Sequence, residues 1–80
     1  MTRNEIATEV RGIFRKLFDD ESIEIHDEMT SADIEEWDSL EHINLIVMIE
    51  RRFNIKFSMN EALKLKNIGE MISLIEQKIR

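Results

Sequence analysis

Ser39 is the residue of this chain best suited to covalent chemistry. It stands in residues 36–41, Glu-Trp-Asp-Ser-Leu-Glu, where an amphipathic pattern begins. A serine near a helix start is usually a cap, but here we expect an exposed hydroxyl. The segment 19–41 holds 11 of the 17 acidic residues and none of the 11 Lys and Arg residues. An exposed hydroxyl on an acidic surface suits the attachment of a group and the docking of a basic enzyme.

A nucleophilic triad of Asp38, Ser39 and His42 is the first alternative. A triad needs a base that reaches the hydroxyl, an acid on the far side of that base, and an oxyanion hole. Here all three residues fall within one helical turn of a small domain, without a Gly-rich elbow. We therefore interpret Asp38 as a helix cap and His42 as an exposed surface histidine, and we expect no catalytic residue.

A metal site is the second alternative. The acidic segment lacks the glycine and the regularly spaced oxygen ligands of a calcium-binding helix-loop-helix motif. His26 and His42 have no companion ligands at useful spacing, and the chain contains no Cys. We interpret both histidines as surface or loop residues and expect no metal ligands.

Composition limits the class of protein further. Eighty residues predict one domain, residues 1–80. The net charge of −6 argues against nucleic acid as a partner, since phosphate binding needs a basic face. No apolar run approaches the roughly 20 residues that span a bilayer, so no membrane association is expected. The default expectation is a monomer in the cytoplasm.

Helical periodicity dominates the chain, so the predicted fold class is all-α. Thr2 and Glu5 have capping-box spacing and place the first helix start near residue 3. A second long helix runs from Ser39 to about Phe53 and ends at Asn54, which tolerates the left-handed conformation. The side chains expected to face the core from this helix are Leu40, Ile43 and Val47, with Ile46 and Leu45 as further candidates.

Two further helices are predicted after an extended link. Ser58 starts a short helix over 59–64, and Asn67 starts a fourth with Lys78 and Arg80 at its C-terminus. The acidic segment 19–38 forms a long first loop, in which a short helical turn is predicted near residues 31–35. Its apolar residues are expected to anchor it to the helices: Ile23, Ile25, Met29, Ile34 and Trp37.

Over essentially its whole length the chain resembles the acyl carrier protein family. The resemblance rests on Trp37-Asp38-Ser39-Leu40, the run 45–50, Phe53-Asn54-Ile55 and the four-helix spacing with a long acidic first loop. It implies a four-helix bundle with three longer helices and one short helix. It also implies that Ser39 carries 4'-phosphopantetheine, delivered from coenzyme A by a phosphopantetheinyl transferase. The arm would hold acyl intermediates as thioesters for fatty acid, polyketide or related biosynthesis.

The family docks basic partner surfaces through its second helix, and this chain departs from that pattern. Asn44 and Arg51 stand where acids are common, and Arg52 adds a second positive charge. The departure favours dedicated loading ligases or transferases and pathway enzymes over ordinary fatty-acid synthase enzymes. Two alternatives stay open: an aminoacyl or peptidyl carrier, and an unmodified helical interaction domain that uses its acidic loop.

Overall fold

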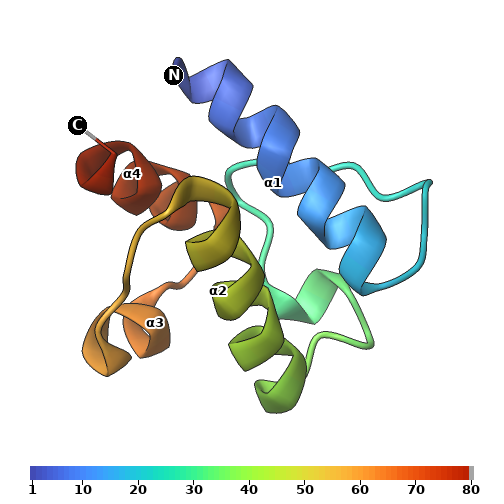
Figure 1. The fold of residues 1–80 in the computed structure, drawn as a ribbon. Helices are drawn as coiled ribbons and strands as arrows, with labels where there is room; N and C mark the ends of the chain where they lie inside the picture. The colour runs from blue at the N-terminus through green and yellow to red at the C-terminus, as the bar shows by residue number, and fades with distance from the viewer. Residues whose placement is uncertain (80) are drawn as a thin grey trace.

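Four α-helices and one 3₁₀ turn make up the secondary structure of residues 1–79, the part of the chain that the computed structural model describes (Figure 1). The predicted position of Arg80 in the last helix falls outside the described residues. The elements are α1 (Arg3–Leu17), η1 (Ser31–Asp33), α2 (Ser39–Phe53), α3 (Met59–Lys64) and α4 (Ile68–Lys78). Three longer helices, one short helix and a long first loop confirm the predicted all-α fold.

Each α-helix begins at a side-chain cap that the sequence predicts. The caps are Thr2, Asp38, Ser58 and Asn67, and each accepts a hydrogen bond from the backbone N–H three residues further on. These bonds satisfy donors that have no partner inside the helix. At the other end of α2, Asn54 adopts the left-handed conformation, with φ 56° and ψ 50°, so the predicted terminator is also confirmed.

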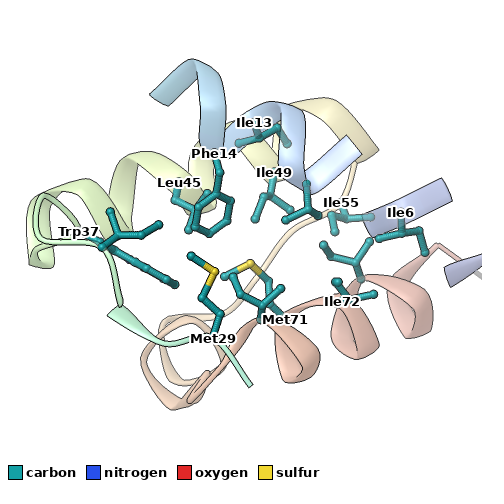
Figure 2. Close-up of a cluster of buried hydrophobic side chains, with 14 residues drawn as sticks. Ile6, Ile13, Phe14, Met29, Trp37, Leu45, Ile49, Ile55, Met71 and Ile72 are labelled. Carbon is teal, nitrogen blue, oxygen red and sulfur yellow. The ribbon is translucent and has the colours of Figure 1, made fainter. Parts of the chain in front are cut away.

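The core lies where α1 packs against both α2 and α4 (Figure 2). Phe14 of α1 stands at its centre, fully buried, with Leu45 and Ile49 of α2 beside it. The remaining core side chains are Ile6, Val10, Ile13, Met29, Ile34, Trp37, Ile55, Ile68, Met71, Ile72 and Ile75. Burial of this apolar surface is the main term that stabilises the bundle.

The predicted inward face of α2 is wrong for three residues. Leu40, Ile43 and Val47 are 68%, 55% and 37% exposed, whereas Leu45, Ile46 and Ile49 are buried. Apolar residues occupy nearly every side of this helix, so a stripe at spacings of three and four residues can be drawn along more than one face. Packing against α1 selects the face, and the other apolar face remains at the surface.

The long first loop is held to the helices by buried side chains and by its backbone. Met29, Ile34 and Trp37 are buried, and Ile23 and Ile25 pack partly buried against the core, as predicted. The Ile68 N–H donates to the Met29 carbonyl over 2.9 Å, and the Gly69 N–H donates to the Asp27 carbonyl over 2.9 Å. The predicted turn appears as η1. The loop therefore lies across the start of α4.

Candidate functional site

Ser39 is the first residue of α2, and its side chain is exposed. Among residues 1–79, no hydrogen-bond partner engages its hydroxyl, so the oxygen is presented to solvent. The capping position is taken by Asp38, whose carboxylate accepts from the Glu41 N–H over 2.8 Å. Because the cap is the preceding residue, the serine hydroxyl does not have to serve the helix and is available for chemistry.

The start of α2 also offers backbone donors to an anion. The N–H groups of Ser39 and Leu40 are in the first turn, where no carbonyl within the helix can accept from them. The Glu41 carboxylate accepts from the Asn44 side-chain amide over 2.9 Å and makes no bond to these donors. The side-chain cap of α2 is therefore Asp38, and the Glu41 carboxylate does not compete for the N–H groups of Ser39 and Leu40. These two N–H groups lie at the positive end of the helix dipole, where an anion is stabilised.

His42 differs from its prediction as an exposed histidine. It is half-buried and joins three parts of the chain, because the Trp37 Nε1–H donates to its Nδ1 over 3.2 Å and its Nε2 lies 2.9 Å from the Ala62 carbonyl of α3. An indole nitrogen only donates, so Nδ1 must accept and Nε2 must carry the hydrogen. With both ring nitrogens engaged, His42 cannot take the Ser39 proton as the base of a triad would.

Trp37 connects this histidine to the core. Its ring is buried, meets the Phe14 ring edge-on at a centroid distance of 5.2 Å, and stacks on the His42 ring at 6.0 Å. The expected role of Trp37 in packing the loop onto the bundle is confirmed. Since Ser39 follows Trp37 by two residues, the same packing fixes where the serine emerges.

A cavity of about 570 Å³ adjoins Ser39 and runs between α2 and α3. Its lining is mostly apolar, and His42 stands in its wall. The lining residues are Ser31, Trp37, Asp38, Ser39, His42, Ile43, Ile46, Val47, Phe57, Ser58, Met59, Ala62, Leu63, Leu65, Lys66, Asn67 and Met71. Sequence reasoning does not find this cavity, because it depends on the distance between α2 and α3, which no local pattern encodes.

His26 and the other side chains considered as metal ligands do not form a metal site in residues 1–79. His26 lies exposed in the first loop beside Glu28, as a loop histidine should. Within residues 1–79, no three His, Cys, Asp or Glu side chains come together as metal ligands would. No helix in the same residues has the length and apolar character needed to cross a membrane.

Comparison with known proteins identifies the family. The family model described as "Phosphopantetheine attachment site" matches residues 8–75. A curated acyl carrier protein from Exiguobacterium sibiricum is 29% identical over 79 residues, which cover 99% of this chain and all of that protein. The prosthetic group of the family, 4'-phosphopantetheine, requires a hydroxyl acceptor, and the exposed hydroxyl beside unsatisfied N–H groups and a cavity fits it.

Solved structures agree in fold. A holo acyl carrier protein from Geobacter metallireducens has a TM-score of 0.87 at 43% identity, covering 92% of this chain and 85% of that one. Acyl carrier proteins from Thermotoga maritima and, as a putative one, from Mycobacterium tuberculosis have TM-scores of 0.82 and 0.80 at 20% and 19% identity. The match to the Thermotoga maritima protein covers 96% of this chain and 89% of that protein. The match to the Mycobacterium tuberculosis protein covers 90% of this chain and 96% of that protein. The chain therefore belongs to the acyl carrier protein family, whose members carry groups and do not catalyse reactions.

Proposed function

We propose that Ser39 is the attachment residue for 4'-phosphopantetheine and that the protein carries acyl intermediates on this arm. The observation that supports the proposal most directly is the exposed Ser39 hydroxyl, which has no hydrogen-bond partner among residues 1–79 and stands at the start of α2 beside the cavity. The protein would act as one carrier domain in the cytoplasm, where a transferase draws on coenzyme A.

Attachment would be catalysed by a phosphopantetheinyl transferase. The Ser39 Oγ forms a bond to the phosphorus next to pantetheine, the pyrophosphate bond of coenzyme A breaks, and adenosine 3',5'-bisphosphate leaves. The hydroxyl proton passes to a base of the transferase, because both ring nitrogens of His42 are engaged. The N–H groups of Ser39 and Leu40 stabilise the resulting phosphodiester anion.

The bound arm supplies a thiol that holds acyl groups as thioesters, and the chain's own residues bind and present them. Ile43, Val47 and Leu63 line the cavity beside Ser39 and offer an apolar wall to a carried chain. Once a partner docks, the tether raises the effective concentration of the carried group, to the mM range for short flexible linkers. A loading ligase or transferase and pathway enzymes with basic docking surfaces would be the partners.

The test uses purified protein, coenzyme A and a broad-specificity phosphopantetheinyl transferase, with intact mass as the readout. We expect a gain of one phosphopantetheine unit in the wild type and none in Ser39→Ala. Ser31→Ala is the matched control, because Ser31 also lines the cavity and is exposed. The control should gain the same unit as the wild type. A wild type that gains nothing, or a Ser39→Ala variant that gains the unit, would overturn the proposal.

A further inference from the structure

The short helix α3 borders the cavity without burying any side chain of its own. None of residues 59–64 is buried, although several of them line the cavity. The flanking Phe57 and Leu65 are half-buried and pack against the core. Burial of an apolar face fixes most helices in place, and α3 lacks such a face. It therefore crosses the cavity as a segment that apolar contacts hold at its two ends.

His42 holds the middle of this segment from the opposite side of the cavity. Its Nε2–H donates to the Ala62 carbonyl over 2.9 Å. Ala62 lies in the last turn of α3, where carbonyl groups have no partner inside the helix. The Lys66 N–H would bond to this carbonyl if α3 continued, but it donates to the Glu70 carboxylate over 3.0 Å. A side chain of α2 therefore supplies the hydrogen bond that completes the end of α3.

The His42 ring is itself fixed from the core. The Trp37 N–H donates to its Nδ1 over 3.2 Å, and the two rings stack at 6.0 Å. Trp37 is buried and meets Phe14 edge-on. A second polar contact, the ion pair of Glu61 and Lys78 at 3.0 Å, ties the first turn of α3 to α4 and does not cross the cavity. His42 therefore sets the distance between α2 and α3.

That distance limits the length of chain that the cavity can accommodate. The cavity has a volume of about 570 Å³ and extends from Ser39 between the two helices. A carried chain that is longer than the cavity enters fully only if α3 moves outward. This movement breaks the bond between His42 and Ala62 and leaves a donor and an acceptor without partners, which is unfavourable.

We infer that His42 is a positioning residue that sets the length of acyl chain sheltered in the cavity, because it holds the middle of α3 at a fixed distance from α2. This inference rests on the proposed carrier function and names the specificity of the same site. Short straight-chain acyl groups fit beside α3 in its observed position, and long ones must displace it. Loss of the bond to Ala62 therefore loosens the shelter around short chains and admits long ones.

The test loads the carrier with acyl arms of graded length and measures how well each thioester is sheltered. A broad-specificity phosphopantetheinyl transferase transfers the arm from acyl-coenzyme A donors, from butyryl to myristoyl, to the wild type and to His42→Asn. Hydroxylamine then attacks the thioester carbonyl carbon and releases a hydroxamate and the free thiol, which intact mass follows. A chain held in the cavity draws its thioester against the protein, so cleavage is slower.

The expected result is a crossover in chain length. Compared with the wild type, His42→Asn should be cleaved faster when it carries short chains and more slowly when it carries long chains. Each change should be about two- to ten-fold, the factor that one hydrogen bond gives to an equilibrium. General loosening of the fold would raise the cleavage rate at every length, so the crossover separates positioning of α3 from a loss of stability.

Two further variants are matched controls. His42→Asn keeps an acceptor near the Trp37 N–H but is too short to reach Ala62, whereas His42→Gln is long enough to place an amide N–H there. His42→Gln should therefore keep the wild-type dependence on chain length. His26→Asn makes the same substitution at an exposed histidine of the first loop and should keep it too.

Parallel profiles for the wild type and His42→Asn, or a uniform rise at all chain lengths, would overturn the inference about His42. A His42→Gln profile like that of His42→Asn would overturn it as well. If His42→Asn does not fold, Trp37→Phe takes its place, because it removes the N–H that orients the ring and must give the same crossover. All these outcomes leave the carrier function standing, whereas a wild type that accepts no arm would overturn the proposed function.

Discussion

The Trp37 indole nitrogen donates a hydrogen bond to His42 Nδ1 over 3.2 Å, and this bond fixes the state of the histidine. It joins the end of the first loop to α2, and His42 Nε2 continues the connection to the Ala62 carbonyl over 2.9 Å. The position of α3 beside the cavity therefore depends on a neutral imidazole with its hydrogen on Nε2.

The tautomer of His42 is the first prediction. Long-range proton–nitrogen NMR spectra of the protein near pH 7.5 should show the Nε2–H form for His42, since the Trp37 N–H occupies Nδ1. His26, exposed in the loop, is the internal comparison: its Nδ1 lies 3.3 Å from the Glu28 carboxylate, which only accepts hydrogen bonds and therefore favours the hydrogen on Nδ1. A spectrum with the hydrogen of His42 on Nδ1 would contradict the observed pair of hydrogen bonds.

Loss of the His42 side chain should loosen α3. His42→Ala removes two hydrogen bonds that together contribute about 1–3 kcal/mol to the free energy of unfolding. Amide hydrogen exchange over 59–64 should accelerate more than exchange in α1, because α3 buries no residue of its own. His26→Ala should leave both stability and exchange within about 0.5 kcal/mol of the wild type. Uniform acceleration in all helices would mean that His42 does not act on α3 specifically.

The two glycines of the chain should respond in opposite directions to alanine. A Cβ at Gly69 would lie 3.0 Å from the Asp27 Cβ and 3.1 Å from the Asp27 carbonyl oxygen, so Gly69→Ala must displace the loop and should lower stability. A Cβ at Gly12 meets nothing within 4 Å, so Gly12→Ala should raise stability by up to about 1 kcal/mol through helix propensity. Urea denaturation of both variants measures the difference, and a destabilised Gly12→Ala with a neutral Gly69→Ala would refute it.

The stability of the start of α3 should depend on pH through the protonation of the Glu61 carboxyl. The Ser58 backbone N–H, and after it Lys78, hold the pKa of the Glu61 carboxyl below its ordinary value. A lowered pKa in the folded state contributes stability above the unfolded pKa, and that stability is lost as the pH falls through the folded value. Carbon-detected NMR titration should give a midpoint for Glu61 below that of a free Glu.

The same titration separates the two causes. In Lys78→Met the Glu61 midpoint should rise only part of the way toward the ordinary value, because the Ser58 N–H is the larger cause and remains. A full return to the ordinary value in Lys78→Met would show that the ion pair with Lys78 acts alone.

Local patterns in the sequence were enough to predict the helices and their ends. Cap spacing placed Thr2, Asp38, Ser58 and Asn67 correctly, because a cap needs only the residue itself and the N–H three positions later. The resemblance in the residues around Ser39 pointed to the family, and it is the basis for proposing Ser39 as the attachment residue. Spaced apolar residues also predicted that the long acidic loop would be anchored to the bundle.

Tertiary structure decided what depends on distances between segments remote in the sequence. The exposed face of α2 followed from its packing on α1, since apolar residues such as Leu40 and Leu45 occur on opposite sides of that helix. The bridge from Trp37 through His42 to Ala62 and the cavity beside Ser39 needed the placement of α3. Hydrogen bonds and cavities between elements depend on how those elements pack, whereas caps and helical periodicity depend only on residues close together in the sequence.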